Sequence, residues 1–504
     1  MADEYNAAVD LLERNLKAGR GAKAAFIDDI GSCTYAQLAE RVDRFCNVLH
    51  ALGVRREERI AIAMLDTCDW PAVFLGAIKA GVVPVAMNTL LTPADYEYQL
   101  RDSRARALFV SEPLLKSFEP IRKNCPDLEH VVTSSLQLND LLFKAPPKAR
   151  AAATRSDDIC FWLYSSGSTG APKGTVHLHS HLIDTAELYA KPVLGIRESD
   201  VVFSAAKLFF AYGLGNALTF PMSVGATAVL MAERPTPDAV FKRMTEKSPT
   251  IFYGVPTLYA ALLASPAFPS KDKLKLRVCT SAGEALPANL GQRWTERTGT
   301  DLLDGIGSTE MLHIFISNKP GEVRYGTTGK PVPGYQVRLV DDHGNVITKP
   351  GELGELQISG PTSAIMYWNQ REKTKNTFQG PWTRSGDKYS FDAEGYFTYG
   401  CRSDDMLKVS GIYVSPAEVE AALVSHEAVL EAAVVGAEDE NKLVKPKAYV
   451  VLKPGQASSD SLTKALQEHV KAKLAPHKYP RWIEFRADLP KTATGKIQRF
   501  KLRA

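Results

Sequence analysis

The N-terminal part of the chain alternates between short apolar segments and segments of helical periodicity, and this alternation constrains the fold more than any other feature. Residues 59–64, 82–86 and 107–110 are apolar runs of strand length. Residues 72–80 lie between the first two runs and have the pattern of a helix that ends at Gly81. Because helices that separate such strands favour side-by-side parallel pairing, the sequence predicts an α/β body around a largely parallel sheet.

Further segments extend this body in both directions. Residues 10–16 predict an amphipathic helix, and a second helix is expected to start behind Thr34 and to end at Gly53. Residues 143–157 are rich in alanine, proline and charged residues and predict a surface connection. A second α/β stretch is expected over residues 158–315.

The pattern changes twice in the C-terminal half. Residues 326–400 carry short strand patterns between glycine turns, which predicts a small β-barrel-like subdomain. The last part of the chain predicts a compact α+β domain, with helices at 416–424 and 459–474 and strands at 429–435 and 447–452. The predicted fold is therefore a large N-terminal domain, residues 1–401, of two α/β subdomains plus the β-barrel-like one, hinged at 402–406 to an α+β C-terminal domain, residues 407–504.

Charge and composition exclude several classes of protein. The 61 basic and 57 acidic residues leave a net charge of +4 spread along 504 residues, which is too weak for a nucleic-acid-binding surface. The seven cysteines form no Cys-x-x-Cys pair, so neither a disulfide framework nor a zinc site is expected. The N-terminus is acidic, and no apolar run approaches the roughly 20 residues of a membrane span. We expect a cytoplasmic monomer or homodimer that binds neither nucleic acid nor membrane.

The most informative motif is residues 164–174, YSSGSTGAPKG, directly after an apolar run. Its glycines let the backbone turn N–H groups toward an anion, its hydroxyls add donors, and Lys173 adds a charge that can reach a phosphate. The Walker spacing is absent, which argues against a P-loop ATPase; the other reading is a flexible surface loop. The candidate phosphate-binding residues are Ser165, Ser166, Gly167, Ser168, Thr169, Gly170 and Lys173.

Two further glycine-containing turns follow predicted strands. Residues 280–287, TSAGEALP, place small residues at the end of a strand, where they leave space for a flat ligand. Residues 304–310, DGIGSTE, combine glycines, hydroxyls and carboxylates. Here Glu310 is suited to hold Mg²⁺ on phosphates, and Thr309 is suited to donate a hydrogen bond to one of them. Each segment taken alone is also compatible with an ordinary structural turn.

Three charged residues complete the set of candidates. Asp387 follows a Ser-Gly turn and is suited to bind a ribose diol, and Arg402 lies at the start of the predicted hinge. Lys496 ends the segment KTATGK on a glycine-containing turn near the C-terminus. Taken alone, Lys496 would be read as a solvated surface charge.

Together and in this order, these residues resemble the adenylate-forming superfamily, which includes acyl-CoA synthetases, peptide-synthetase adenylation domains and firefly luciferase. The resemblance spans essentially the whole chain. Within the superfamily the chain is most similar to benzoate–CoA and 4-hydroxybenzoate–CoA ligases, through residues 207–216, 304–315 and 406–416. In one departure, Cys401 stands before Arg402, where the family usually has a glycine, which leaves the local turn geometry open.

The resemblance implies a two-step reaction that uses ATP, Mg²⁺ and coenzyme A. A carboxylate attacks the α-phosphate of ATP to give an acyl-AMP and pyrophosphate, and the thiol of coenzyme A then displaces AMP. Catalysis of the first step is expected to rest on positioning and on charge stabilisation at phosphorus. In this scheme Lys496 bridges the substrate carboxylate and the α-phosphate, Thr309 contacts phosphate, and Glu310 anchors Mg²⁺.

The resemblance also implies a nucleotide site and an acyl site. The implied nucleotide residues besides the phosphate-binding ones are Ser281, Gly283 and Glu284 beside adenine, Asp387 and Arg402 on the ribose, and Asp304, Gly305, Ile306, Gly307 and Ser308. The acyl site is expected to be a slot that fits an aryl ring better than a long alkyl chain. Its expected walls are Phe209, Phe210 and Tyr212, its open side Ala211, Gly213, Gly305 and Gly307, and its remaining residues Ile306, His313, Ile314 and Lys496. Alternatively, Phe209 and Phe210 are core residues.

The C-terminal domain is expected to act as a mobile lid that turns between the two half-reactions. Asp404 matches the usual hinge position, and the residues expected to face coenzyme A are Lys408, Ser410, Gly411 and Tyr413.

The expected function is therefore that of an ATP-dependent ligase joining benzoate or a hydroxybenzoate to coenzyme A. Three alternatives stay open: an aryl-AMP ligase that loads a carrier protein, a luciferase-like oxygenase, and an AMP-binding sensor. The expected aryl slot disfavours the oxygenase, and the presence of Lys173 and Lys496 disfavours the sensor. The preferred substituent on the aromatic ring is not predicted.

Overall fold

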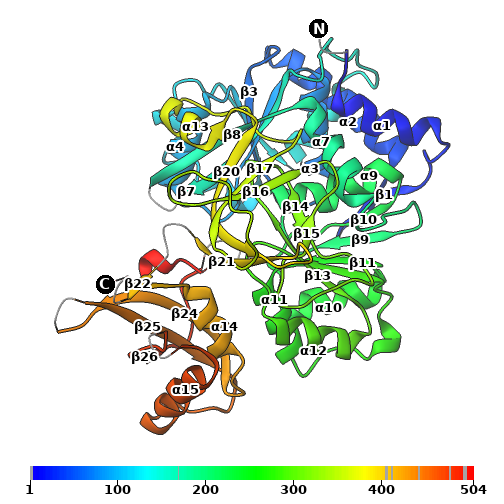
Figure 1. Cartoon of the computed structure of the whole chain (residues 1–504). Helices are drawn as coiled ribbons and strands as arrows, with labels where there is room; N and C mark the ends of the chain where they lie inside the picture. Colours follow the sequence, from blue (N-terminus) through cyan, green and yellow to red (C-terminus); the bar gives the residue numbers. More distant parts are fainter. Residues whose placement is uncertain are drawn as a thin grey trace.

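The structure is a computed structural model that describes residues 4–134, 136–167, 170–402, 407–409, 412–440, 443–475, 478–491 and 497–503. Figure 1 shows a large body of layered sheets and helices and, beside it, a smaller body formed by the last hundred or so residues. No helix among the described residues is long and apolar enough to cross a membrane.

The first sheet of the large body has seven strands among the described residues, in the order β18-β8-β7-β4-β3-β5-β6. Its inner strands are parallel, and β8 and β18 add an antiparallel edge. The strands are β3 (Arg59–Ala63), β4 (Val83–Ala86), β5 (Ala107–Ser111), β6 (His130–Ser134), β7 (Ile159–Gly167), β8 (Gly170–Leu178) and β18 (Met366–Tyr367). The predicted strand–helix–strand core of the N-terminal region is therefore confirmed.

The second sheet has nine strands in the described chain, in the order β15-β14-β13-β12-β11-β9-β10-β1-β2. The neighbouring strands β13, β12, β11, β9, β10 and β1 are parallel to one another. Strand β2 pairs antiparallel at one edge, and β14 and β15 pair antiparallel at the other. They are β1 (Ala24–Ile27), β2 (Ser32–Thr34), β9 (Val201–Ser204), β10 (Thr227–Val229), β11 (Ile251–Gly254), β12 (Val278–Ser281), β13 (Leu302–Gly307), β14 (Ile314–Ser317) and β15 (Lys330–Pro331).

The two α/β subdomains are not consecutive in the sequence, and this corrects the predicted division at residue 158. Strands β1 and β2 lie near the N-terminus but join the second sheet, where Phe26 pairs with Ala228. Strands β7 and β8 follow the predicted boundary but join the first sheet, where Val85 pairs with Trp162. Apolar patterning identifies a strand without identifying its partner, because any buried neighbour satisfies it.

Helices cover both sheets, as Figure 1 shows. They are α1 (Ala7–Lys17), α2 (Tyr35–Ala51), α3 (Asp69–Lys79), α4 (Pro93–Ser103), α5 (Glu112–Leu115), α6 (Leu136–Lys144), α7 (His179–Thr185), α8 (Ala211–Leu214), α9 (Phe220–Val224), α10 (Pro237–Glu246), α11 (Pro256–Ala264) and α12 (Ala288–Thr298). The predicted cap of α2 is confirmed: Thr34 accepts from the Gln37 N–H at 3.2 Å, and the Gln37 side chain accepts from the Thr34 N–H at 2.9 Å. One buried cluster spans both sheets, with Phe109 and Phe161 from the first and Phe26 and Leu303 from the second.

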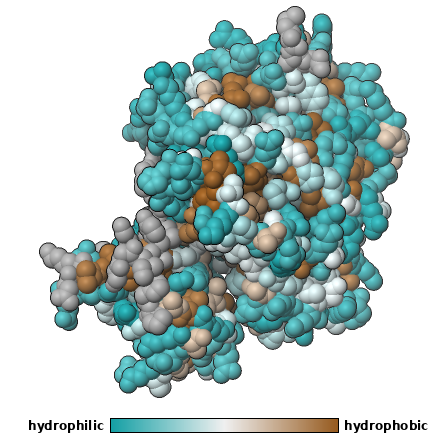
Figure 2. Space-filling model, in the orientation of Figure 1, coloured by the Kyte–Doolittle hydropathy of each residue, from teal (hydrophilic) through white to brown (hydrophobic). Residues whose placement is uncertain are grey.

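A third, antiparallel sheet closes the large body. It has five strands in the described residues: β16 (Gln336–Val340), β17 (Gly354–Ser359), β19 (Phe378–Gln379), β20 (Trp382–Phe391) and β21 (Phe397–Arg402), with α13 (Arg371–Thr377) beside them. Its position along the chain matches the predicted subdomain of short strands. Figure 2 shows that apolar residues gather in the middle of the large body on the face toward the viewer, with polar residues around them.

The C-terminal body combines a hairpin, a small sheet and two helices. Its elements are β22 (Leu407–Val409), β23 (Ile412–Val414), α14 (Pro416–Val424), β24 (Val429–Glu438), β25 (Val444–Leu452), α15 (Asp460–Lys473), β26 (Trp482–Phe485) and the 3₁₀ turn η5 (Arg499–Lys501). The helix predicted at 416–424 is confirmed to the residue, and Ser415 caps it by accepting from the Glu418 N–H at 3.3 Å. The predicted hinge, 402–406, lies outside the described residues after Arg402.

A buried histidine holds the first helix of the chain. Nδ1 of His179 accepts a hydrogen bond from the backbone N–H of Ala7 at 3.2 Å, at the N-terminus of α1. His179 is 1% exposed, and this burial lowers its pKa to about 4. The native state therefore keeps His179 neutral over a pH range in which the unfolded chain protonates it.

We expect His179→Gln to be less stable than the wild type at neutral pH and to lose this deficit in acid. Between pH 6.5 and about 4 the unfolded wild-type chain binds a proton at His179 that the native state does not bind. This term lowers wild-type stability by up to about 1.4 kcal/mol per pH unit as the pH falls, and the variant lacks it. The measurement is the midpoint of thermal unfolding of both proteins over this range. A difference that does not change with pH would contradict the prediction.

Candidate active site

The predicted phosphate-binding segment is a β-hairpin rather than an open loop. Ser165 on β7 lies opposite Lys173 on β8, and Gly167 lies opposite Gly170. The prediction of a loop over 164–174 is wrong for both arms, because cross-strand pairing extends the strands almost to the tip. The tip itself, residues 168 and 169, lies outside the described residues, and for Ser166, Gly167 and Gly170 only the backbone is described. The hairpin thus presents the Ser165 and Lys173 side chains from facing strands.

Lys173 and Glu310 form an ion pair although they are 137 positions apart in the sequence. Nζ of Lys173 lies 3.6 Å from Oε1 of Glu310, and the two side chains are 18% and 15% exposed. The hydroxyl of Ser165 donates to the same carboxylate oxygen at 3.3 Å. Burial raises the pKa of Glu310, but the Lys173 charge and a tyrosine hydrogen bond outweigh it, so the pKa lies below its usual value. Glu310 is therefore an anion that already has a cation beside it.

Tyr367, which was not predicted from the sequence, completes this cluster. Its hydroxyl donates to Oε1 of Glu310 at 2.7 Å and accepts from Nζ of Lys173 at 3.1 Å. Tyr367 belongs to the two-residue strand β18, which pairs with β8. The surrounding residues 365–368, IMYW, form a short apolar run that is typical of a core strand, so nothing in the local sequence predicts a polar role for Tyr367.

His177 supports the neighbouring turn and was also missed. Its Nε2–H donates to the backbone carbonyl of Thr309 at 2.8 Å, and its Nδ1 lies 3.1 Å from Nδ1 of His181. Burial lowers the pKa of His177 to about 4, so the imidazole is neutral. Ser308 accepts from the Met311 N–H at 3.1 Å, which closes the turn on its other side. The predicted residues Thr309 and Glu310 are therefore held by a hydrogen-bonded turn at the end of β13.

The predicted site residues in and near the turn after β12 differ in their exposure to solvent. Gly283 is exposed with a φ of +97°, a conformation that favours glycine, and Glu284 follows it. Ser281 is fully buried, and its hydroxyl has no hydrogen-bond partner among the described residues. Asp304 is 6% exposed, and burial raises its pKa well above the usual value although it accepts from backbone N–H groups of Leu286 and Gly305. The Asp304 side chain is thus buried within β13, and its contact with nucleotide stays a prediction.

The predicted ribose-binding residues lie together. Asp387 and Arg402 are opposite each other on β20 and β21, and Nη1 of Arg402 lies 3.1 Å from Oδ1 of Asp387. The same nitrogen donates to the Ser385 carbonyl at 3.2 Å. Cys401 is a buried strand residue opposite Lys388, so the departure noted in the sequence is accommodated within β21.

The predicted acyl-site residues lie on two facing segments. Phe210, Ala211, Tyr212, Ile306 and Gly307 are half-buried, whereas Phe209, Gly213, Gly305, His313 and Ile314 are buried. Phe209 belongs to the main core and packs on Phe210 with ring centres 4.4 Å apart.

Tyr212 and His313 form the polar part of this wall. The Tyr212 hydroxyl bonds to that of Thr280 at 2.5 Å. Nε2–H of His313 donates to Oδ1 of Asn216 at 3.1 Å and to the Tyr212 carbonyl at 3.3 Å. Burial lowers the pKa of His313 to about 3, so the ring is neutral and its Nδ1 is an acceptor, with no partner among the described residues. Asn216, which fixes this tautomer, was not predicted.

The glycines of the expected slot allow close packing of backbone instead of leaving it open. A Cβ at Gly213 would lie 2.0 Å from the carbonyl oxygen of Lys207, and one at Gly307 would lie 2.6 Å from that of His313. At Gly305 the nearest atom would be a side-chain carbon of Ile314, at 3.1 Å. The expected open side is therefore wrong for Gly213 and Gly307, since neighbouring backbone already fills the space.

Several predicted residues lie outside the described part of the chain. These are Ser168, Thr169, Asp404, Ser410, Gly411 and Lys496. Lys408 and Tyr413 are described by their backbones alone, as facing residues of the hairpin β22–β23. Ile497, the residue after Lys496, donates its backbone N–H to Oε1 of Glu284 at 3.1 Å. The C-terminal segment that carries Lys496 therefore contacts the turn that contains Gly283 and Glu284.

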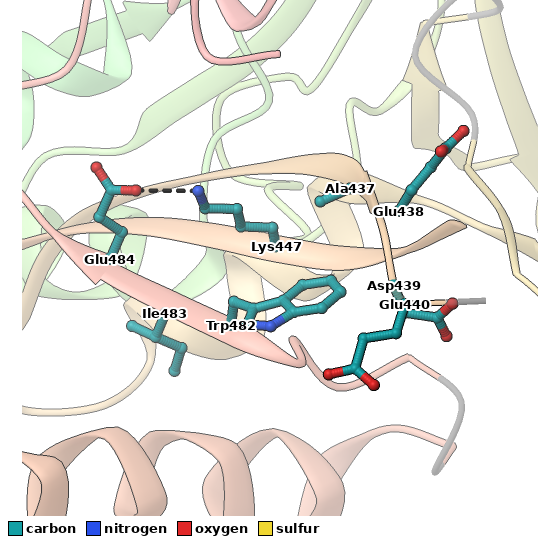
Figure 3. Close-up of a pocket in the computed structure, with 8 residues that line it drawn as sticks. All are labelled: Ala437, Glu438, Asp439, Glu440, Lys447, Trp482, Ile483 and Glu484. Carbon is teal, nitrogen blue, oxygen red and sulfur yellow. Dashed lines mark ion pairs between the residues drawn. The ribbon is translucent and has the colours of Figure 1, made fainter. Parts of the chain in front are cut away.

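A pocket on the C-terminal body has a different character. It has a volume of 770 Å³ and lies at one end of the small sheet, where Lys447 and Glu484 are paired at 3.0 Å. Figure 3 shows the Trp482 ring between this ion pair and the acidic side chains of Asp439 and Glu440. None of the predicted site residues lines it. No group of three or more His, Cys, Asp or Glu residues suited to a metal ion occurs in the described part of the chain.

The chain resembles known proteins over its full length. Residues 12–368 match the family of AMP-binding enzymes, and residues 418–496 match the AMP-binding enzyme C-terminal domain. The chain is 64% identical to a benzoate–CoA ligase of Thauera aromatica, covering 100% of this chain and 96% of the relative. It is 51% identical to a 4-hydroxybenzoate–CoA/benzoate–CoA ligase of Rhodopseudomonas palustris, covering 99% and 94%. The crystal structure of a benzoate CoA ligase from Burkholderia xenovorans LB400 superposes with a TM-score of 0.95 at 57% identity, covering 99% and 100%.

We expect Gly213→Ala to destabilise the acyl-site segment. The added Cβ would overlap the Lys207 carbonyl, so backbone must move, at a cost of at least about 1–3 kcal/mol. The measurement is the midpoint of thermal unfolding together with the KM for the aromatic acid. Gly21→Ala is a matched control, because its nearest neighbour would be the Ala36 Cβ at 3.6 Å. Equal midpoints for the two variants would contradict the packing role of Gly213.

Proposed function

The chain belongs to the AMP-binding enzymes, and from this premise we propose that it joins a small aromatic carboxylic acid to coenzyme A at the expense of ATP. The acid, benzoate or a hydroxybenzoate, first attacks the α-phosphate of ATP, which forms a P–O bond and releases pyrophosphate. The sulfur of coenzyme A then attacks the acyl carbon, and AMP leaves. The relatives that carry the names of benzoate and 4-hydroxybenzoate ligases support this class of acid.

The observation that carries the proposal is the hydrogen bond from Ile497 to Glu284. It supports the proposal because Ile497, the residue after Lys496, contacts the turn where the adenine is expected, on the same body as Lys173 and Glu310. In this arrangement Lys496 is proposed to reach the reacting carboxylate and the α-phosphate and to stabilise the charge that develops there. The Asp387–Arg402 pair is proposed to hold the ribose.

The Glu310 carboxylate fits the chemistry of Mg²⁺. It is an ionised oxygen donor, and Mg²⁺ is usually held by one or two carboxylates together with substrate phosphates. When bound there, Mg²⁺ would neutralise charge on the phosphates. Lys173 and the Ser165 hydroxyl are proposed to bind the β- and γ-phosphates from the hairpin side, and Thr309 from the turn.

The acyl site is proposed to receive the aromatic ring against Tyr212, Ile306 and Phe210. The Tyr212 ring is fixed by its bond to Thr280, and the His313 ring packs 5.6 Å from it. A wall fixed in this way needs no reordering when a flat ring binds, which favours aryl acids over flexible alkyl acids.

The C-terminal domain, residues 407–504, is proposed to turn about residues 402–406 between the half-reactions and to present the hairpin of Lys408 and Tyr413 to coenzyme A. A cytoplasmic location and a monomeric or homodimeric state stay predictions.

The deciding experiment is ATP–pyrophosphate exchange, followed by AMP release with free coenzyme A. The panel of acids comprises benzoate, its hydroxy-, amino- and halo-derivatives, cyclohexanecarboxylate and hexanoate. Exchange with benzoates, and AMP release that needs free coenzyme A, are the expected results. No exchange with any acid would contradict the proposal, and acyl transfer only to a pantetheinylated carrier protein would contradict the choice of acceptor.

We expect Lys496→Ala to separate the two half-reactions. The substitution should slow adenylation by at least roughly 100-fold, because a charge placed at the reacting phosphate is lost. A benzoyl-AMP supplied directly should still be converted to the thioester at close to the wild-type rate. Lys464→Ala, at an exposed position on α15, is the matched control. Equal losses in both half-reactions would contradict this division of roles.

A further inference from the structure

We propose that Tyr367 is a positioning residue for adenylation, which keeps the Glu310 carboxylate in place while Lys173 turns from that carboxylate to the nucleotide phosphates. The inference rests on the proposed function. It concerns a residue that no motif of the sequence marks, in a strand that belongs to neither the hairpin nor the Thr309–Glu310 turn.

The Tyr367 hydroxyl has one proton, and the geometry decides where it goes. Oε1 of Glu310 lies 2.7 Å away and can only accept, while Nζ of Lys173 lies 3.1 Å away and can only donate. The hydroxyl therefore donates to Glu310 and accepts from Lys173. Burial and the Glu310 charge raise the pKa of Tyr367, so the phenol keeps its proton. One neutral group thus joins the cation to the anion.

The Tyr367 ring is itself firmly held. The residue is 3% exposed, pairs with Thr175 of β8, and donates its backbone N–H to the Thr374 hydroxyl at 3.0 Å. Its ring packs against Phe378 with centres 5.2 Å apart. Fixing the ring in this way fixes the direction of the hydroxyl, which has little rotamer freedom left to lose.

The segment before Tyr367 holds Glu310 at a second point. The backbone N–H of Ala364 donates to the Glu310 carbonyl at 2.7 Å, and the Thr362 hydroxyl donates to the Met311 carbonyl at 2.8 Å. Backbone and side chain of Glu310 are therefore both bound by residues 362–367. The carboxylate stays in position even without its lysine partner.

This arrangement matters because Lys173 is proposed to bind the phosphates as well as Glu310. When phosphates arrive, we expect Nζ to shift from the carboxylate, 3.6 Å away, toward the new anion. Nζ also lies 4.2 Å from the centre of the Tyr367 ring, so the face of the ring attracts the cation along its path. Glu310 keeps the Tyr367 hydrogen bond throughout, and its free lone pairs are then available to Mg²⁺ on the phosphates.

The test is Tyr367→Phe, which keeps the ring and removes the hydroxyl. We expect ATP–pyrophosphate exchange to fall roughly tenfold to hundredfold, with a raised KM for ATP and a greater Mg²⁺ requirement. Thioester formation from supplied benzoyl-AMP should stay at the wild-type rate. Tyr5→Phe is the matched control, because it removes a tyrosine–carboxylate hydrogen bond of 2.8 Å, to Asp10, in the N-terminal helix α1 and its flank.

A binding measurement separates this role from catalysis. Trp368 follows Tyr367 and packs on Trp162 with ring centres 4.5 Å apart, so two of the six tryptophans of the chain report on this strand by their fluorescence. Titration with ATP at several Mg²⁺ concentrations should show weaker Mg²⁺-dependent binding in Tyr367→Phe. This measurement needs no aromatic acid. A wild type that shows no exchange with any acid would contradict only the proposed function, and ATP binding would still test the role of Tyr367.

A double-mutant cycle with Glu310→Ala completes the design. If Tyr367 acts by holding the Glu310 carboxylate, Tyr367→Phe should add little to the loss of Mg²⁺-dependent ATP binding already caused by Glu310→Ala. Additive losses would overturn the proposal, as would wild-type exchange and ATP binding in Tyr367→Phe. Two further results would assign Tyr367 a purely structural role and overturn the proposal as well. One is an equal loss in both half-reactions, and the other is a lower midpoint of thermal unfolding together with a loss of all activities.

Discussion

The cluster of Lys173, Glu310 and Tyr367 is the interaction on which the arrangement of the site depends. Two charges in a largely buried setting are stable only when each has a partner in good geometry. Lys173 comes from a hairpin of the first sheet, Glu310 from the turn after β13 of the second, and Tyr367 from a strand added late in the chain. The cluster therefore ties the first sheet, through β8 and β18, to the turn after β13 of the second sheet.

The identities of the reactive groups could be read from the sequence, but most of their supports could not. The hydroxyl- and glycine-rich segments, the Thr34 cap and the limits of α14 follow from local rules, and local rules are visible in one stretch of sequence. Tyr367, His177 and Asn216 act through partners that lie 57 to 194 positions away in the sequence, so no local spacing predicts them. The burial of Asp304 could not be predicted from its position beside a motif either, because burial depends on the packing of distant segments.

The same limit explains the acyl site. The glycines of the acyl site were predicted to leave open space for the ligand. The space left by a missing Cβ can equally be filled by neighbouring backbone, and at Gly213 the Lys207 carbonyl fills it. Which of the two occurs depends on chain crossings that are not encoded locally. Phe209 and Phe210 pack together, but Phe209 is a buried core residue and Phe210 is half-buried.

The exchange of strands between the two sheets has a consequence for how the chain is made. Strand β1 finds its parallel partner β10 only about two hundred residues later, since Phe26 pairs with Ala228. During synthesis one edge of β1 has no paired strand until β10 has been made. The strands β3 to β8 of the other sheet are synthesised in that interval. Neither sheet can therefore be completed early in synthesis, because the second sheet still needs the strands from β9 to β15 and the first sheet still needs β18.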